Sequence, residues 1–271
     1  MRDKIDLLRK RLITQAKGKV VEKYTGRDQH LIKAVNVLAD LDNVFNLLFE
    51  QVREWYGMHF PELEKFCNEP AAYLKLLYNL GDRSNFTYEK ICELYENKLT
   101  AKQIEERARL SIGSPIEEAD LAEIKLLAVN ALNLREERNY LEKYLETTMK
   151  SVCPNLLALA GPVVGCRLLS AAGSLKRLAC MAGSTIQVIG AEKALFAHLR
   201  EGSPSPKHGY LFQHPLVRGV HRTKKGKMAR TLGAKIALGA KKDYFGDKHE
   251  DSEKEKRALA ARAQQLGGAR K

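Results

Sequence analysis

The sequence has 271 residues, of which 44% are hydrophobic, 7% aromatic and 29% charged. That length fits one large domain or two smaller ones, and the hydrophobic fraction is sufficient for a folded core. Few aromatic residues, with Leu, Ala, Lys and Glu abundant, favour helices and argue against a β-sandwich. The five cysteines form no C-x-x-C pair, which disfavours a zinc ribbon or a disulfide framework. No apolar run reaches the roughly 18 residues of a membrane span, and the charged N-terminus lacks a signal-peptide core.

The net charge of +13 is concentrated near the C-terminus. Residues 207–271 contain 17 Lys or Arg and 6 Asp or Glu, which gives +11, so the remainder of the chain is nearly neutral. A cationic section of this kind is typical of a surface that binds a polyanion, because each neutralised phosphate releases condensed counterions. The alternative interpretation is a solubilising basic face followed by a disordered tail.

Two long helices are predicted from apolar residues that alternate at spacings of three and four. The first seam is Leu31, Val35, Leu38, Asp42, Phe45, Phe49, Val52 and Tyr56, and the second is Ile124, Leu127, Ala131, Leu134, Arg138, Leu141 and Leu145. Two such helices in one chain are most simply paired as an antiparallel coiled-coil hairpin. If paired residue numbers sum to about 180, Asp42 faces Arg138, and this lone pair of seam charges sets the register. Alternatively, both side chains merely reach water.

The remaining segments complete an all-α protein. We expect an N-terminal helix and linker over 1–27, the coiled-coil hairpin over 28–153 with a helical insertion at about 60–112, a compact helical module over 154–247, and a charged tail over 248–271. Asp28 and Asn85 resemble helix caps, and Ser114 is expected to open the second long helix. Ile91, Leu94 and Leu99 are the expected apolar positions of the insertion. Residues 226–242 predict an amphipathic helix, with Met228 on its apolar side and Lys227 opposite. The tail is predicted to be either a frayed helix or disordered.

No catalytic chemistry is evident in the sequence. The chain lacks a phosphate-binding G-x-x-x-x-G-K-[ST] loop, an H-E-x-x-H zinc motif and a G-x-S-x-G nucleophile elbow. The seven histidines are too scattered for metal-ligand spacing. Cys153, Cys166 and Cys180 lie in apolar sequence and are interpreted as small core residues. We therefore predict no catalytic residue, no metal and no cofactor in this chain.

Several short motifs follow one another in a characteristic order. They are EWYGMHFPEL at 54–63, GAEK at 190–193, SPKHG at 205–209, QHP at 213–215 and GKMAR at 226–230. Together they closely resemble the Nop-domain proteins: the archaeal scaffold of box C/D small ribonucleoproteins, its eukaryotic nucleolar counterparts and a related spliceosomal protein. The similarity is collinear from about residue 28 to 247. The brief tail and the QHP sequence favour the archaeal box C/D branch.

The resemblance implies a non-enzymatic scaffold. Members self-associate through the coiled coil, and their Nop module binds box C/D guide RNA at a kink-turn together with a ribosomal-protein-like kink-turn protein. They also hold fibrillarin, which binds S-adenosylmethionine and methylates ribose 2′-hydroxyls of target RNA. The implied location is cytoplasmic in an archaeon and nucleolar in a eukaryote. Archaeal relatives usually carry a fibrillarin-docking α/β domain before the first heptad helix, where this chain has about 27 residues.

The candidate site residues fall into three groups. The RNA-binding group is Lys193, Gln213, His214, Arg222, Lys224, Lys225, Lys227 and Arg230, and the composite protein–RNA group is Gly190, Ala191, Glu192 and Lys207. The coiled-coil and dimer group is Leu31, Val35, Leu38, Phe45, Phe49, Val52, Leu127, Leu134 and Leu141.

Each of the main site interpretations has a structural alternative. GAEK is expected to open a helix, with Ala194, Leu195 and Leu199 packed behind it. The small residues before Lys193 would let backbone N–H groups approach phosphate, whereas Glu192 alternatively complements the helix dipole. His214 is expected to stack on a base, and a helix cap is its alternative. Trp55, Tyr56 and Phe60 are interpreted as core residues, with base stacking as their alternative. The rival functions are a structural coiled-coil adaptor and a spliceosomal-type kink-turn assembly protein without a methylation role.

Overall fold

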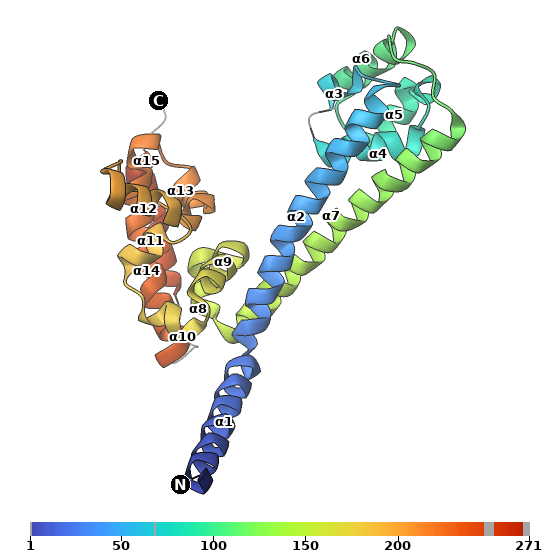
Figure 1. The fold of residues 1–271 in the computed structure, drawn as a ribbon. Helices are drawn as coiled ribbons and strands as arrows, with labels where there is room; N and C mark the ends of the chain where they lie inside the picture. The colour runs from blue at the N-terminus through green and yellow to red at the C-terminus, as the bar shows by residue number, and fades with distance from the viewer. Residues whose placement is uncertain (1, 68, 247–251, 268–271) are drawn as a thin grey trace. The chain divides into compact units, whose positions relative to one another are not determined.

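The computed structural model describes residues 2–67, 69–246 and 252–267 (Figure 1). Every regular element in these ranges is helical, so the all-α prediction is confirmed. The chain divides into two compact units. We call residues 38–141 the hairpin unit, and residues 1–37 together with 142–271 the C-terminal unit.

The two long predicted helices are α2 (Arg27–Gly57) and α7 (Glu118–Val152). The hairpin unit also contains α3 (Leu63–Phe66), α4 (Pro70–Leu80), η1 (Arg83–Asn85), α5 (Tyr88–Leu94) and α6 (Lys98–Arg109). The C-terminal unit contains α1 (Arg2–Thr25), α8 (Pro154–Ala160), α9 (Pro162–Ala172), α10 (Leu175–Cys180), α11 (Gly183–Val188), α12 (Glu192–Glu201), η2 (Tyr210–Gln213), α13 (Pro215–Arg218), η3 (Arg222–Lys224), α14 (Lys225–Phe245) and α15 (Glu253–Gly267).

In the hairpin unit α2 and α7 lie side by side and antiparallel (Figure 1). The predicted register is confirmed, because Arg138 Nε donates to Asp42 Oδ1 at 2.8 Å. Of the seam residues, Leu31, Val35, Leu38, Phe45 and Val52 are buried, and Phe49, Leu127, Leu134 and Leu141 are half-buried. The five buried side chains are enclosed by their own chain and cannot at the same time contact a second copy. The dimer contact predicted for them is therefore corrected to an intrachain seam.

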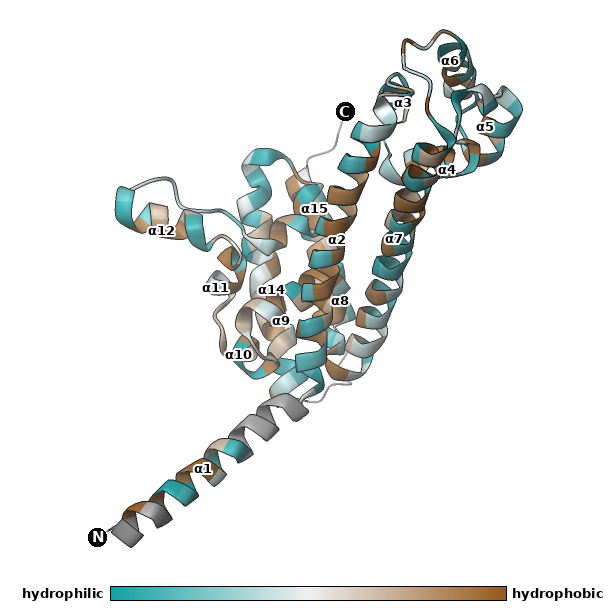
Figure 2. Ribbon diagram, turned by 45° about the vertical axis from the view of Figure 1, so that its right-hand side comes forward, coloured by the Kyte–Doolittle hydropathy of each residue, from teal (hydrophilic) through white to brown (hydrophobic). Residues whose placement is uncertain are grey.

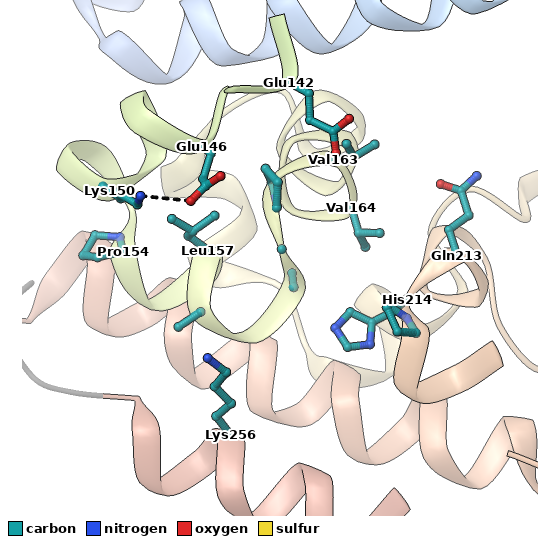
Figure 3. A pocket seen from close by; sticks show the side chains of 15 residues that line it. Glu142, Glu146, Lys150, Pro154, Leu157, Val163, Val164, Gln213, His214 and Lys256 are labelled. Atoms are coloured by element: carbon teal, nitrogen blue, oxygen red, sulfur yellow. Dashed lines mark ion pairs between the residues drawn. The ribbon is translucent and has the colours of Figure 1, made fainter. Parts of the chain in front are cut away.

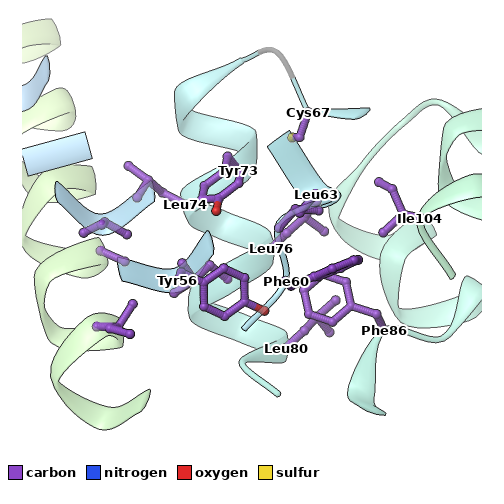
Figure 4. Close-up of a cluster of buried hydrophobic side chains, with 14 of the residues drawn as sticks. Tyr56, Phe60, Leu63, Cys67, Tyr73, Leu74, Leu76, Leu80, Phe86 and Ile104 are labelled. Carbon is purple, nitrogen blue, oxygen red and sulfur yellow. The ribbon is translucent and has the colours of Figure 1, made fainter. Parts of the chain in front are cut away.

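The far end of the hairpin is a small helical tip with its own core (Figure 4). Tyr56 and Phe60 are fully buried there among residues of α3, α4 and α6, as predicted. The hydroxyl of Tyr56 donates to Gly81 O at 2.6 Å, which satisfies its one polar atom. The EWYGMHFPEL motif therefore supplies the tip with core residues.

His59, in the same motif, closes the tip. Its Nδ1 donates to Ser114 O at 2.8 Å, and its Nε2 accepts from the Arg83 N–H at 3.1 Å. The Arg83 guanidinium donates to His59 O and Gly113 O, at 3.2 and 2.6 Å. A Cβ on Gly113 would lie 1.9 Å from His59 O, so only glycine allows this approach. Both ring nitrogens of His59 are thus engaged in holding the loop before α7.

That loop explains why α7 begins later than predicted. The Ser114 N–H, which we expected in the first turn of the helix, instead donates to Met58 O at 2.8 Å. Glu62 accepts from Ser111 Oγ at 2.7 Å and from Ile112 N–H at 3.1 Å. Long-range bonds therefore keep residues 111–114 extended, and α7 begins at Glu118.

Two further expectations for the tip are wrong. Asn85 does not cap a helix but lies within η1, where its side chain donates to Leu80 O at 2.9 Å. The cap of η1 is Asp82, which accepts from Ser84 N–H at 2.8 Å. Leu99, expected to be apolar core, is 78% exposed.

In the C-terminal unit α14 lies among α8, α10 and α11. Met228, Leu232 and Ile236 of α14 are fully buried, as the periodicity predicted. Helix α11 approaches closely at a glycine pair: a Cβ on Gly233 would lie 2.8 Å from Gly183 O. Small residues therefore set the helix spacing here, in agreement with the Ala- and Gly-rich sequence.

The base of the long helices belongs to the C-terminal unit, so the compact division lies inside α2 and α7 and not near residue 153. Asp28, expected to cap its own helix, instead accepts from Leu175 N–H of α10 at 2.9 Å. Gln29 Nε2 donates to Gly173 O at 3.1 Å, and Ser170 Oγ donates to Asn36 Oδ1 at 2.9 Å. These bonds tie the start of α2 to α9 and α10.

The charged tail is partly an ordered helix. Residues 253–267 form α15, whose Leu259 and Leu266 are 1% and 7% exposed. It lies against α8, α13 and α14. Of the two alternatives expected for the tail, a frayed helix or disorder, this segment is therefore helical, and its two leucines pack against the neighbouring helices. Residues 248–251 and 268–271 of the predicted tail lie outside the described residues.

Within the described ranges no single helix is long and apolar enough to cross a membrane. The helices α8 and α9 meet that criterion only as a pair, across a bend of 116°.

Candidate nucleic-acid interface

Two motif-bearing segments of the C-terminal unit lie side by side. The Gly209 N–H donates to Gln187 O at 3.0 Å, and the Tyr210 N–H donates to Ile189 O at 2.9 Å. The side chain of Gln187 donates to Lys207 O at 2.7 Å. These three bonds bring the GAEK and SPKHG motifs, which are 15 residues apart in sequence, onto one surface.

Two glycines permit this close approach. A Cβ on Gly209 would lie 1.9 Å from Ile189 O, nearer than any real contact. Gly190 has φ of 88°, and its Cβ would lie 2.6 Å from the ring of Tyr210. Each position therefore requires glycine, one for space and the other also for its left-handed backbone.

The turn that begins α12 uses Glu192 differently from the RNA interpretation. Its carboxylate accepts from the Gly190 N–H at 2.7 Å, and the Ala191 N–H donates to Val188 O at 2.9 Å. Those two backbone donors are thus already satisfied, which corrects the expectation that they face phosphate. The structural alternative holds for Glu192, while Lys193 is exposed.

Helix α12 projects from the helices around α14 (Figure 2). We expected its residues Ala194, Leu195 and Leu199 to be packed behind the GAEK turn. Ala194 is exposed, however, and Leu199 is 70% exposed. Phe196 is 59% exposed as well. An amphipathic helix with its large apolar side chains in solvent offers a surface for a protein.

Cations gather around the start of α14. Lys207 is exposed, and its aliphatic stem lies against Gly226, where an added Cβ would be 3.2 Å from Lys207 Cβ. Lys225 Nζ lies 4.6 Å from the centre of the Phe212 ring. Lys227, two residues further along α14, is exposed. The other predicted cations of this segment are Arg222 and Arg230, which are exposed, and Lys224, which is half-buried.

No exposed carboxylate offsets these charges within α14. Its one acidic residue, Asp243, is 1% exposed and caps α8 by accepting from Asn155 N–H and Leu156 N–H at 3.0 and 2.8 Å. The accessible charge of α14 is therefore entirely positive.

Two aromatic side chains that were not among the predicted site residues, His208 and Phe212, lie among the cations. The rings of His208 and Phe212 stack at 4.7 Å with an interplanar angle of 26°, and Phe212 is 40% exposed. Burial lowers the pKa of His208, with further lowering by Lys225 and Lys207, so the ring is neutral at pH 7. In the sequence, this pair could have been found from the spacing of four residues between two aromatic rings within a cationic stretch.

Gln213 and His214 face a different neighbourhood. Gln213 Oε1 accepts from Arg167 of α9 at 2.5 Å, and His214 Nδ1 accepts from the Leu216 N–H at 3.2 Å. Burial lowers the pKa of His214, opposed by a hydrogen bond to the Leu159 backbone. His214 therefore caps α13, the role left as its alternative.

Gln213 and His214 also line a pocket of about 680 Å³ (Figure 3). Its walls come from the end of α7, from α8 and α9, and from α15. Glu146 and Lys150 form an ion pair of 2.9 Å at its edge. The predicted RNA-binding group is thus divided: Lys225 lies at the aromatic pair, together with Lys207 of the composite group, whereas Gln213 and His214 do not.

The described cysteines include two whose thiol pKa is raised by burial, Cys67 and Cys166. Burial raises the pKa of Cys166 to about 12, and Cys153 is buried as expected. Cys180 is exposed, in contrast to the core position predicted for it.

The surface around α14 has the groups needed to bind phosphate and to stack on a base.

Residues 37–265 match the model of the Nop family, described as a snoRNA binding domain and fibrillarin. The chain belongs to the Nop domain family. The Nop match covers most of both units and includes every residue of the surface described above.

Relatives of this Nop protein come from archaea and eukaryotes. It is 43% identical to a NOP5 family protein of Methanocaldococcus jannaschii over 86% of this chain and 56% of the relative. It is 39% identical to nucleolar protein 58 of Neurospora crassa over 85% of this chain and 38% of the relative. The chain thus spans about half of the length of these relatives, or less. A crystal structure of a fibrillarin/Nop5p complex is similar with a TM-score of 0.49 and 26% identity, covering 98% of this chain and 80% of that one.

Proposed function

We propose that this Nop protein is a non-catalytic scaffold of a box C/D ribonucleoprotein for RNA-guided 2′-O-methylation. It binds kink-turn RNA together with the kink-turn protein. The observation that carries the proposal is the cluster of Lys207, His208, Phe212 and Lys225, which joins cations to an exposed aromatic pair. The family description, which names small nucleolar RNA binding, supports the same ligand class.

The cluster has the chemistry of RNA recognition. Lysine side chains neutralise phosphates, whereas a stacked aromatic pair offers a flat face to an unpaired base. A kink-turn supplies both, because it bends a duplex and extrudes nucleotides from the stack. Neutral His208 suits stacking better than a charged ring that remains hydrated. Lys227 and Arg230, one helical turn apart and exposed, extend the phosphate contact along α14.

A protein-bound RNA fits this surface better than RNA alone. Phe196 and Leu199 of α12 are exposed apolar side chains that RNA phosphates would not cover. They follow Lys193 in the chain, and Gly190 in the turn before α12 lies against the ring of Tyr210, two residues before Phe212. We assign α12 to the kink-turn protein and the α14 side to the RNA, so that the two ligands bind together.

Fibrillarin is the proposed partner for chemistry. The methyl group would come from S-adenosylmethionine bound to fibrillarin, and the role of this chain would be placement of the RNA. In an archaeon the assembly would be cytoplasmic, and in a eukaryote it would be nucleolar, as the name of the eukaryotic relatives suggests.

Charge reversal tests the RNA surface. Lys227→Glu with Arg230→Glu removes two phosphate contacts and should weaken assembly on a kink-turn RNA by about 25- to 60-fold at about 0.1 M salt. The control is Lys90→Glu with Lys98→Glu, two exposed lysines of the hairpin unit with the same change in charge. A gel shift in the presence of the kink-turn protein measures both. Equal weakening by both pairs would mean that only net charge matters, and unchanged assembly in the Lys227→Glu, Arg230→Glu variant would favour the structural-adaptor alternative.

A further inference from the structure

Gln187 joins three elements of the C-terminal unit. It is 7% exposed on α11, and its backbone N lies 3.3 Å from where a Cβ of Gly233 in α14 would be. Its side chain donates to Lys207 O at 2.7 Å, and its own carbonyl accepts from Gly209 N–H at 3.0 Å. The backbone on both sides of His208 is therefore fixed to the helical core.

Gly226 lies under the Lys207 side chain. A Cβ at Gly226 would be 3.2, 3.5 and 3.6 Å from Cβ, Cγ and Cδ of Lys207. Contact along three successive carbons shows that the stem lies flat on the first turn of α14. Because Gln187 holds the Lys207 backbone, the Cβ of Lys207 has little freedom to retreat from an added methyl group.

Local helix formation does not explain this glycine. Gly226 is the second residue of α14, and glycine is among the poorest helix formers. Its backbone is not in the left-handed region, so no special conformation requires it. The close approach of Lys207 is the feature that an alanine would disturb.

We propose that Gly226 and Gln187 are positioning residues that seat Lys207 for a phosphate of the bound RNA. A lysine normally loses much side-chain freedom when it binds. A stem already confined against α14 has less freedom to lose, which strengthens the contact without adding a new one. The proposal rests on the RNA-binding function proposed above.

Gly226→Ala separates this role from folding. The gain in helix propensity opposes the cost of the close contact with Lys207, so alanine should change the melting temperature little, yet weaken assembly on a kink-turn RNA with its kink-turn protein by about two- to eightfold at about 0.1 M salt. Lys207→Ala, which removes one phosphate contact, should weaken assembly by about five- to eightfold and reduce the slope of log affinity against log salt by about 0.7–0.9. Gly57→Ala is the matched control, because a Cβ there meets nothing within 4 Å.

A double-mutant cycle decides the mechanism. If Gly226 acts through Lys207, then Gly226→Ala should cause no further loss in a Lys207→Ala background. Gln187→Met, which removes the amide donor, should likewise be silent there in assembly affinity. The melting temperature of Gln187→Met is measured as well. If that variant unfolds, the cycle between Gly226→Ala and Lys207→Ala still decides the mechanism.

Two outcomes would overturn the inference. Gly226→Ala with full affinity, or with the same loss in both backgrounds, would show that Gly226 does not seat Lys207 while leaving the proposed function intact. Unchanged affinity in Lys207→Ala would remove Lys207 from the RNA surface, which counts against the proposed function at this position as well.

Discussion

Asp42 and Arg138 pair across the two long helices, with Arg138 Nε 2.8 Å from Asp42 Oδ1. Each is the one charged residue in an otherwise apolar seam. Their side chains are 33% and 22% exposed, so the pair is partly shielded from water. Any shift of one helix against the other would place a charge against an apolar residue, and the pair therefore fixes the register.

We expect either Asp42→Ala or Arg138→Ala to lower the free energy of unfolding by about 1–3 kcal/mol, between the effects typical of exposed and buried pairs. The double replacement should cost less than the sum of the two, because no unpaired charge remains. Urea unfolding followed by circular dichroism measures all three variants. Additive effects would mean that the two side chains do not interact in solution.

Self-association should depend on the outer face of the hairpin. Val44 and Leu47 of α2 are 45% and 59% exposed, whereas Phe45 is 4% exposed in the intrachain seam. Val44→Glu with Leu47→Glu should halve the mass in light scattering and leave the helix content unchanged. Phe45→Asp should instead lower the helix content. A dimer mass retained by the first variant would place the contact elsewhere.

The aromatic pair is expected to stack on a base. Phe212→Ala should weaken assembly with kink-turn RNA by about 1–3 kcal/mol, or roughly fivefold or more. Phe245→Ala is the control, because Phe245 is an exposed aromatic residue at the opposite end of α14. Fluorescence anisotropy with labelled RNA compares them. Equal affinities for the two variants would count against stacking at Phe212.

Stability should fall in mild acid because of His214. Burial lowers its pKa in the folded protein below the unfolded value of about 6.5, so the unfolded chain takes up the proton first. The stability contributed by neutral His214 is complete above about pH 6.5 and is lost as the pH falls below it. His208 titrates in the same direction.

The test replaces His214 by Asn, which can cap α13 but does not titrate. We expect the melting temperature of His214→Asn to fall less than that of the wild type between about pH 7 and about pH 5.5. The dependence that remains includes that of His208. Identical pH dependence in both proteins would exclude His214 as a source.

Local patterns were sufficient to predict the helices and their register. Apolar spacing reveals which side of a helix is buried, and the lone charges at 42 and 138 then align the two seams. The buried stripe of Met228 and Ile236 follows from the same periodicity. The periodicities depend on residues within one or two helical turns of each other, and the register depends on the one charge that each seam contains.

Long-range bonds account for most of the differences. The local sequence predicts a helix start at Ser114, but the Ser114 N–H donates a hydrogen bond to Met58 O. The local sequence predicts that Asp28 caps its own helix, but its carboxylate instead accepts from the Leu175 N–H at the start of α10. His214 has the residue type of an RNA contact, yet a short local cap and burial against Leu159 determine its role. Such partners are distant in sequence or chosen by packing, so spacing alone does not reveal them.

The candidate surface shows the same division. Clustered cations predicted that α14 would carry positive charge, and Lys227 and Arg230 are exposed there. The stacking of His208 on Phe212 and the exposure of Phe196 depend on how η2 and α12 leave the core. Those geometries are set by Gly190 and Gly209, whose close contacts are visible only in the fold.

The most direct measurement is the affinity of this chain for kink-turn RNA with and without the kink-turn protein, at the same salt concentration. A composite surface predicts weak, salt-sensitive binding to naked RNA and binding at least about tenfold tighter once the protein is present. The gain should be lost in Phe196→Ala with Leu199→Ala while the weak binding remains. Equal affinity for naked and protein-bound RNA would contradict the account.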